Sequence, residues 1–252
     1  MRYFIEVSYK GTRYAGFQIQ ANAPTIQSEV ERACKILFKK DISLTGSSRT
    51  DAGVHAHQNY FHLDVDAEIA PRMLYNFNAL LPPDIAINSI QPVDPSSHAR
   101  FDAISREYSY FIYAAKNPFL ADSAWFYPYR ININALQHAA AILLQQNDFT
   151  SFAKRNSQVH THVCHLKSST WRLHPDKWEY TVKSNRFLRG MVRGLVGTML
   201  QVGRGAINLQ QFTQIIKSKD CTQANFTTPA HGLFLNSVQY PKGYFNKADE
   251  EC

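Results

Sequence analysis

The residues with the clearest chemical potential lie in a small-residue loop, Gly46-Ser47-Ser48-Arg49-Thr50-Asp51-Ala52-Gly53. Small side chains let the backbone turn tightly and let a bulky substrate come close. A carboxylate two residues from a guanidinium can be held by a charge-assisted hydrogen bond, which keeps Asp51 ionised and fixes its direction. By itself, such a loop is more often a structural Arg/Asp turn, so a catalytic use needs further evidence.

The charge and the aromatic content indicate which molecules could approach this loop. Of the 252 residues, 27 are Lys or Arg and 20 are Asp or Glu, which gives a formal net charge of +7, and 16 Phe, 13 Tyr and 3 Trp accompany them. A modest positive charge can serve solubility alone. Residues 9–14 and 125–130 mix cations with aromatic rings. Because cations hold phosphates and rings stack on unpaired bases, these runs favour a nucleic acid partner.

Composition also excludes several classes of protein. Apolar residues make up 44% of the chain, too many for a disordered protein. The apolar stretch at residues 188–200 is interrupted by Arg189 and Arg193 and is shorter than the roughly 20 residues of a membrane span, so no membrane partner is expected. The N-terminus lacks the apolar core of a signal peptide, and we therefore expect a cytoplasmic protein.

Cysteine and histidine residues give little support for a metal or redox site. The four cysteines have no CxxC spacing, so ordinary reduced thiols are expected. His160, His162 and Cys164 could share one face of a strand, with His165 next to them. A structural zinc site usually requires four converging ligands, and we expect no metal here.

Periodicity predicts an α+β fold in two similar halves, each a mainly antiparallel sheet backed by helices. In the first half, strands are expected at residues 2–9, 54–65 and 85–93, and helices at residues 26–37 and 71–81. In the second half, strands are expected at residues 107–114, 124–129, 164–173, 178–183 and 233–240, and helices at residues 133–146, 187–202 and 209–217. The halves are expected to span residues 1–100 and 101–241 and to join across a central basic cleft, with residues 242–252 as a flexible tail.

The expected helix at residues 187–202 has an unusual composition. One face is apolar, and Arg186, Arg189 and Arg193 are expected on a neighbouring face. Such a face is more often solvated than bound to a ligand. Three glycines, Gly190, Gly194 and Gly197, each cost about 1 kcal/mol relative to Ala inside a helix. We therefore expect another segment or a ligand to pass close to this helix.

Several motifs together resemble one known family. Arg49-Thr50-Asp51-Ala52-Gly53-Val54-His55-Ala56 resembles the catalytic signature of the tRNA pseudouridine synthase A family. Five further matches follow the family's order: Tyr9-Lys10-Gly11-Thr12-Arg13-Tyr14-Ala15-Gly16-Phe17-Gln18, His98-Ala99-Arg100-Phe101 with Arg106-Glu107-Tyr108-Ser109-Tyr110, Asp148-Phe149-Thr150-Ser151-Phe152, Met191-Val192-Arg193 with Val196-Gly197, and Gly232-Leu233. Ser48 departs from the pattern because the family usually has Gly there, and Ser is tolerated if its backbone is not at positive φ.

The resemblance implies an isomerisation of uridine to pseudouridine, with no cofactor. It assigns the catalytic carboxylate to Asp51, as nucleophile or as base, and pairs Arg49 with Asp51 in the empty site. It implies that Tyr108 stacks on the flipped base and is a candidate for the C5 proton transfer. Substrate contacts are expected from Tyr110 on the same strand face, from Arg193 and Arg189, and from Leu233 as an apolar wall against the uracil.

By the same resemblance, the partner is tRNA, the targets are positions 38, 39 and 40 of the anticodon stem-loop, and the protein is a homodimer. An alternative is a catalytically inactive tRNA-binding or RNA-folding module of the same fold. Pure binding would not require Asp51, Arg49 and Tyr108 together. A glycosidase is disfavoured, because its usual mechanism needs a second carboxylate and no partner motif accompanies Asp51.

Overall fold

The computed structural model describes residues 1–155 and 159–245. The chain forms two compact units. The first contains Met1–Ile104 and the C-terminal segment from Leu235, and the second contains Ser105–Phe234. Each unit is a mainly antiparallel sheet with helices packed beside it, so the expected α+β class is confirmed.

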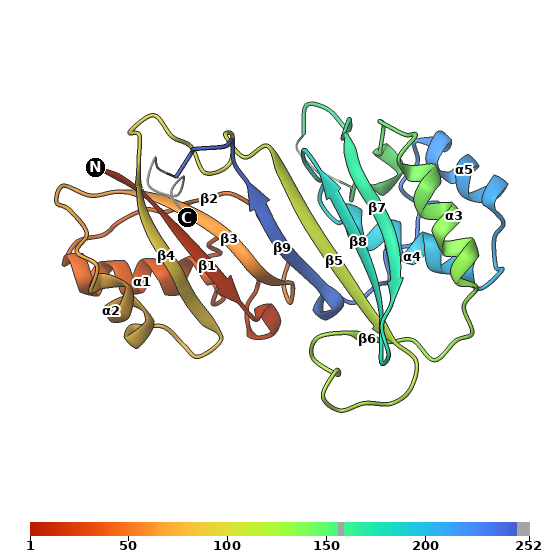
Figure 1. Cartoon of the computed structure of the whole chain (residues 1–252), viewed down its shortest axis with the longest axis horizontal. Coiled ribbons are helices and arrows are strands. Elements are labelled where there is room, and N and C mark those ends of the chain that lie inside the picture. Colours follow the sequence, from red (N-terminus) through yellow and green to blue (C-terminus); the bar gives the residue numbers. More distant parts are fainter. Residues whose placement is uncertain (156–158, 246–252) are drawn as a thin grey trace. The chain divides into compact units, whose positions relative to one another are not determined.

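In the first unit the sheet has the order β4-β1-β3-β9 (Figure 1). Its strands are β1 (Arg2–Tyr9), β3 (His55–Asp64), β4 (Ile85–Val93) and β9 (Leu233–Gln239), and the short β2 (Thr45–Gly46) pairs with β3. Helices α1 (Ile26–Phe38) and α2 (Met73–Leu80) pack together beside this sheet. The short 3-10 turn η1 (Gly11–Arg13) follows β1.

Helix α1 begins where the sequence predicts, because Thr25 caps it. The Thr25 hydroxyl accepts a hydrogen bond from the backbone N–H of Ser28 over 3.1 Å, and the Ser28 hydroxyl accepts one from the backbone N–H of Thr25 over 3.0 Å. This reciprocal pair satisfies two donors that the first turn of a helix leaves without partners. The buried residues Ile26, Val30 and Ala33 then lie on the face that packs inward.

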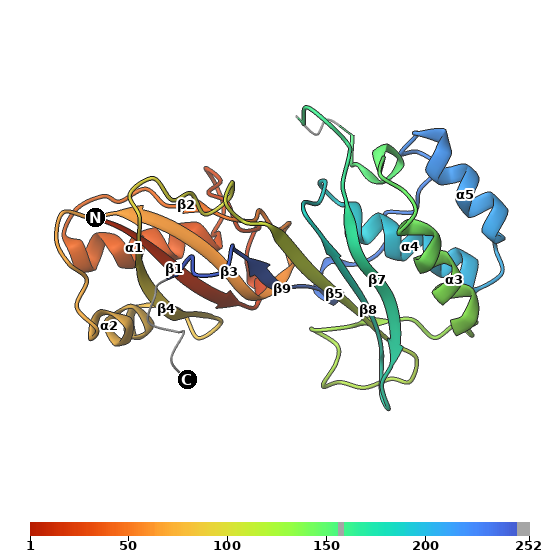
Figure 2. The same cartoon turned by 45° about the horizontal axis from the view of Figure 1, so that its top comes forward.

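In the second unit the sheet order is β5-β8-β7 (Figure 2). A short β6 pairs in parallel with β5. The strands are β5 (Ser105–Tyr113), β6 (Trp125–Phe126), β7 (Leu166–Leu173) and β8 (Trp178–Ser184). The helices are α3 (Ile133–Leu143), α4 (Met191–Gly203) and α5 (Leu209–Ser218), which pack on one another, and the 3-10 turns are η2 (Thr150–Phe152) and η3 (Ala230–Gly232).

Four details differ from the expectations. The strand expected at 124–129 is only Trp125–Phe126, since Pro128 has no backbone N–H to continue a ladder. The helix expected from residue 187 begins at Met191, because Gly190 has φ 74°, outside the helical region. The last strand, expected in the second half, belongs to the first unit from Leu235 onward. Residues 101–104, expected in the same half, also belong to the first unit.

The fourth difference concerns the expected flexible tail. Tyr244 and Phe245 pack on the aromatic cluster of the first unit, where Phe245 stacks on Tyr60 at 5.4 Å between ring centroids. Tyr244 also donates a hydrogen bond from its hydroxyl to the carboxylate of Asp102. The start of the expected tail is therefore held against the sheet, and residues 246–252 lie outside the described residues.

No helix in the described ranges is both long enough and apolar enough to cross a membrane.

Candidate active site

Asp51 opens a tight turn between β2 and β3. The backbone N–H of Val54 donates to the carbonyl oxygen of Asp51 over 3.2 Å, which closes a four-residue turn. Gly53, the third residue of the turn, has φ 78°, whereas Ala52 before it has no positive φ. This combination is that of a type II turn, which favours Gly at the third position. The turn leaves the Asp51 side chain half-buried at the start of β3.

The hydrogen bonds before Asp51 converge on one buried side chain, Asn59. The Ser47 hydroxyl donates to Asn59 Oδ1 over 2.7 Å, and Asn59 Nδ2 donates to the Ser48 carbonyl oxygen over 2.9 Å. Asn59 Nδ2 also donates to the Tyr9 hydroxyl over 3.1 Å, and that hydroxyl is 2.8 Å from the Thr50 hydroxyl. Because Asn59 is fully buried, the three residues around Arg49 are fastened to β3 and β1.

Ser48 is compatible with this loop. It is buried, and the described non-glycine residues with positive φ are Lys39 and Lys219, so Ser48 is not among them. The condition for tolerating Ser in place of the family's Gly is therefore met.

The loop after β1 braces the same turn from the other side. The backbone N–H of Phe17 donates to the Thr50 carbonyl oxygen over 3.1 Å, and that of Gly11 donates to His55 Nδ1 over 3.1 Å. Asp84 holds this loop by accepting bonds from Arg13 Nε at 2.7 Å and from the Tyr14 hydroxyl at 2.6 Å. The hydrogen bond from Arg13 lowers the pKa of the Asp84 carboxyl.

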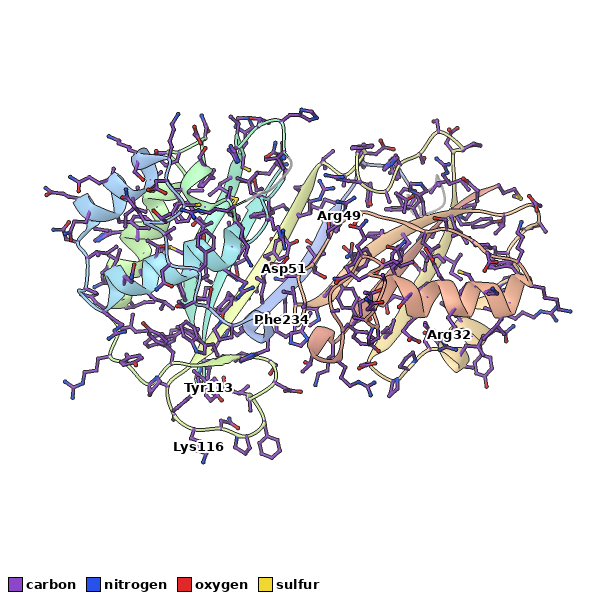
Figure 3. All side chains as sticks on the ribbon, turned by 180° about the vertical axis from the view of Figure 1, so that it is seen from behind. Arg32, Arg49, Asp51, Tyr113, Lys116 and Phe234 are labelled. Atoms are coloured by element: carbon purple, nitrogen blue, oxygen red, sulfur yellow. The ribbon has the colours of Figure 1, made fainter. Side chains whose placement is uncertain are left out.

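Arg49 is exposed and does not pair with Asp51. Figure 3 labels both residues on the loop before β3. Among the described residues, no hydrogen bond or ion pair joins the Arg49 guanidinium to the Asp51 carboxylate. The expected Arg49–Asp51 pair is therefore absent in this structure, and the turn is held instead by the main chain and by Asn59.

Tyr108 and Tyr110 lie two residues apart on β5, on the same face of the second unit's sheet. Tyr108 pairs with Val182 of β8, and its ring meets Phe187 edge to face at 5.0 Å between centroids. Its exposed fraction is 8%. Phe187 thus fixes the orientation of the Tyr108 ring.

Tyr110, for which a substrate contact is expected, has a structural role within the second unit. The residue is fully buried, and its hydroxyl donates to the Pro229 carbonyl oxygen over 2.8 Å. A Cβ added at Gly232 would come within 2.8 Å of Tyr110 Cζ, so the backbone of η3 lies directly on the ring. Burial raises the pKa of the Tyr110 hydroxyl. Tyr110 therefore positions residues 229–233, including Leu233, whose exposed fraction is 7%.

Arg193 is the one expected arginine that lies within α4. Its Nε donates to the Thr228 carbonyl oxygen over 2.7 Å, and the Thr228 hydroxyl donates to the Arg193 carbonyl oxygen over 2.8 Å. Residues 228–233 thus connect Arg193 to Tyr110 and then to Leu233. Arg189 is exposed in the turn before the helix, where its carbonyl oxygen accepts from the Lys154 N–H over 2.9 Å.

The expected row of arginines on one helix face is consequently wrong, because Arg186 and Arg189 precede the helix. The expectation of a close neighbour is confirmed. A Cβ at Gly194 would lie 2.7 Å from the Phe226 ring, and one at Gly197 would lie 2.3 Å from the Asn225 carbonyl oxygen. Segment 225–228 therefore packs on α4 at positions where only glycine fits. This packing places Thr228 within hydrogen-bond distance of Arg193.

The segment rich in His and Cys does not converge on one point. Cys164 is buried, and burial raises the pKa of its thiol to about 11, whereas His160 and His165 are exposed. In the part of the chain that the structure describes, no three His, Cys, Asp or Glu side chains are grouped as ligands for a metal ion.

The positioning residues Asn59, Asp84 and Thr228 were not expected from the sequence. Each acts on a residue far away in the chain, such as Asp84 on Arg13 and Thr228 on Arg193. No hydrophobic periodicity or turn motif in the sequence points to a positioning role for Asn59 or Thr228. Asp84 has one local signal, because it follows the Pro82-Pro83 pair.

Comparison with known proteins identifies the family. A family model described as tRNA pseudouridine synthase matches residues 139–241. A Parabacteroides distasonis protein named tRNA pseudouridine synthase A is 41% identical over 250 residues, which cover 98% of this chain and 99% of that protein. A Bacillus subtilis protein of the same name is 38% identical over 245 residues, which cover 95% and 99%. The resemblance seen in the motifs is therefore confirmed, and the chain belongs to the tRNA pseudouridine synthase A family, a family of isomerase enzymes.

Proposed function

We propose that this enzyme converts uridine to pseudouridine in tRNA, with Asp51 as the catalytic carboxylate. The observation that carries the proposal is the turn that holds Asp51 half-buried, braced from both sides by the Asn59 network and the loop after β1. Such bracing is what a catalytic group requires, because a small displacement of the reacting groups is costly to rate. The names of the relatives at 38 to 41% identity support the same activity.

The chemistry is an isomerisation within one nucleotide. The bond between uracil N1 and the ribose C1′ breaks, the base turns, C5 bonds to C1′, and the proton on C5 passes to N1 through solvent or a side chain. Atoms and electrons balance within the substrate, so no external reductant or group donor takes part. Asp51 acts either by attacking C1′ or by removing a proton from the sugar.

The residues of the second unit would hold the flipped nucleotide. Tyr108, whose ring is oriented by Phe187, would stack on the uracil and is a candidate to move the C5 proton. Leu233 would form an apolar wall, and Arg193 would bind a phosphate. Exposed Arg49 would help displace the target base, and Arg189 would contact the RNA backbone. The target we propose is the anticodon stem-loop, bound by a homodimer.

The decisive experiment measures tritium release from tRNA labelled at uridine C5, for the wild type and for Asp51→Asn. The Asn variant keeps the size and polarity of the side chain but removes its charge. We expect it to release no tritium while binding tRNA within a few-fold of the wild type. Release at the wild-type rate would refute the assignment of Asp51.

The same assay tests the second candidate, an inactive tRNA-binding module. That alternative predicts tight tRNA binding by the wild type without any tritium release, at every enzyme concentration. Mapping pseudouridine in total tRNA from cells with and without the protein then identifies the uridines that are modified.

A further inference from the structure

A row of aromatic rings ends on an arginine in the second unit. We name Trp125, Tyr127, Tyr129 and Arg204 the aromatic row. The ring centroids of Trp125 and Tyr127 are 4.6 Å apart, and those of Tyr127 and Tyr129 are 4.9 Å apart. The Arg204 guanidinium carbon lies 3.9 Å from the Tyr129 centroid, which is a close cation–π contact. The row thus begins at β6 and ends at the C-terminus of α4.

The backbone on both sides of the aromatic row is fastened. The Tyr127 N–H donates to the Tyr113 carbonyl oxygen over 2.7 Å and extends the pairing of β6 with β5, whose end is marked by Tyr113 in Figure 3. Three residues beyond Tyr129, the Asn132 N–H donates to the Gly203 carbonyl oxygen over 2.8 Å. Tyr129 is therefore held between two fixed points and does not lie in a loose loop.

Exposure changes sharply along the row. Tyr127 is buried, and burial raises the pKa of its hydroxyl. Tyr129, one step further, is 48% exposed, and Arg204 and Arg130 are exposed as well. In the described ranges neither of these two guanidiniums has an ion-pair partner. A partly exposed ring that Arg204 contacts, followed in the sequence by the exposed Arg130, is suited to a ligand that is both flat and anionic.

Helix stabilisation explains only part of this arrangement. A cation at the C-terminus of α4 interacts favourably with the helix dipole, which accounts for Arg204. It does not account for the exposure of Tyr129 or for the exposed Arg130 that follows it. A nucleotide in an unpaired RNA segment would use all three groups, since its base can stack on a ring while its phosphates meet the guanidiniums.

The position of Arg204 relative to Arg193 is set by α4. The two residues are eleven positions apart, which corresponds to about 16 Å along an α-helix and to three turns plus about 20° of rotation. They therefore lie on nearly the same side of one rigid element. The two arginines could therefore contact different nucleotides of one bound RNA.

From these observations we propose that Tyr129, Arg204 and Arg130 form a second contact site for the RNA, about 16 Å along α4 from Arg193. An unpaired base stacks on Tyr129, and the two arginines bind the adjoining phosphates. This proposal rests on the proposed function, because it takes RNA as the ligand and Arg193 as a contact near the target. It adds a binding site separate from the residues that act on the uridine.

The test compares Tyr129→Ala with Tyr75→Ala. The control removes the same kind of ring from α2, where Tyr75 is 77% exposed and therefore more open to solvent than Tyr129. Binding of unmodified full-length tRNA is measured at several salt concentrations, and tritium release gives kcat and KM. Loss of one base stack should weaken binding by Tyr129→Ala about 5- to 150-fold and raise KM, with kcat unchanged. Tyr129→Phe keeps the stack and should bind like the wild type.

Arg130→Gln separates the phosphate contacts from stacking. It should reduce the slope of log affinity against log salt concentration by about 1, whereas Tyr129→Ala should leave the slope unchanged. The proposal is overturned if Tyr129→Ala binds tRNA as tightly as Tyr75→Ala. It is equally overturned if Tyr129→Ala only lowers the melting temperature, or only changes the oligomeric state measured by light scattering, because the row would then be structural or a contact between copies.

Failure of the proposed function would look different. In that case the wild type would bind tRNA but release no tritium, and the affinities of the Tyr129 and Arg130 variants would still show whether the second contact site exists.

Discussion

The side-chain amide of Asn59 donates a hydrogen bond to the main-chain carbonyl oxygen of Ser48, over 2.9 Å, and so ties a buried strand residue to the loop three residues before Asp51. The same side chain accepts from the Ser47 hydroxyl and reaches the Tyr9 hydroxyl, which contacts Thr50. One amide therefore sets the path of the loop that carries the proposed catalytic group.

Replacing Asn59 by Ala should lower both stability and turnover. The change removes the hydrogen bonds of Asn59 with the Ser47 hydroxyl and the Ser48 carbonyl oxygen, and each lost bond costs about 0.5–1.5 kcal/mol. Chemical denaturation should show this loss, and tritium release should show a lower kcat with a smaller change in KM, since the proposed RNA contacts at Arg189 and Arg193 lie outside this loop. Asn88→Ala, at an exposed position of β4, is the matched control and should change neither quantity. A full kcat for Asn59→Ala would mean that Asp51 is positioned without this network.

Gly53→Ala tests whether the turn conformation matters for activity as well as for stability. At φ 78° an alanine is strained by roughly 1–2 kcal/mol, and the strain should be relieved by a shift of the neighbouring Asp51. Gly243 supplies a control with the same kind of strain, because its φ is 74° and nothing lies within 4 Å of an added Cβ. Both variants should lose similar stability, and only Gly53→Ala should lose kcat. Equal activity of the two variants would contradict the role of the turn.

Tyr108→Phe and Tyr110→Phe should have opposite effects. Tyr110→Phe removes the hydroxyl that donates to Pro229, and we expect a loss of about 1 kcal/mol in the free energy of unfolding with near-normal turnover at low temperature. Tyr108→Phe removes the proposed proton-transfer group and should slow tritium release by about 10²-fold or more with little change in stability. The measurements are thermal unfolding and single-turnover tritium release. A normal rate for Tyr108→Phe would limit Tyr108 to stacking.

His62 should make the first unit sensitive to acid. Burial lowers its pKa from 6.5 to about 4, so the unfolded chain takes up the proton first as the pH falls. The contribution of neutral His62 to stability is therefore complete above pH 6.5 and is lost as the pH falls towards 4, by up to about 3 kcal/mol. Urea unfolding measured across this range should show the decline.

His62→Gln is the control for that experiment, because Gln can still accept the hydrogen bond that His62 Nδ1 accepts from the Ala99 N–H at 3.1 Å. This variant should show a flatter dependence of stability on pH between 6.5 and 4. The nearby carboxyls of Asp64 and Asp102 have lowered pKa values and contribute mainly at lower pH. An unchanged pH profile in the Gln variant would assign the decline to another group.

Features that depend on near neighbours could be predicted from the sequence. Thr25 caps α1 through the backbone of Ser28, three residues away, and the pattern of β4 is complete between Ile85 and Val93. The ordered motifs around Asp51 and Arg193 identified the family, because those residues recur with the same neighbours in order along the chain. Local hydrogen bonding and periodicity are properties of a few consecutive residues, so they can be read without the fold.

Other features were decided only by the tertiary structure. In the part of the chain that the structure describes, no hydrogen bond or ion pair joins Arg49 to Asp51 two residues away, whereas Asn59 and Tyr9, fifty residues apart, hold the loop. Tyr110 lies on the same strand face as Tyr108 but is a buried structural residue, because residues 229–232 pack on its ring. Such outcomes depend on which distant segments meet and compete for the same donors and the same space, and no short stretch of sequence contains that information.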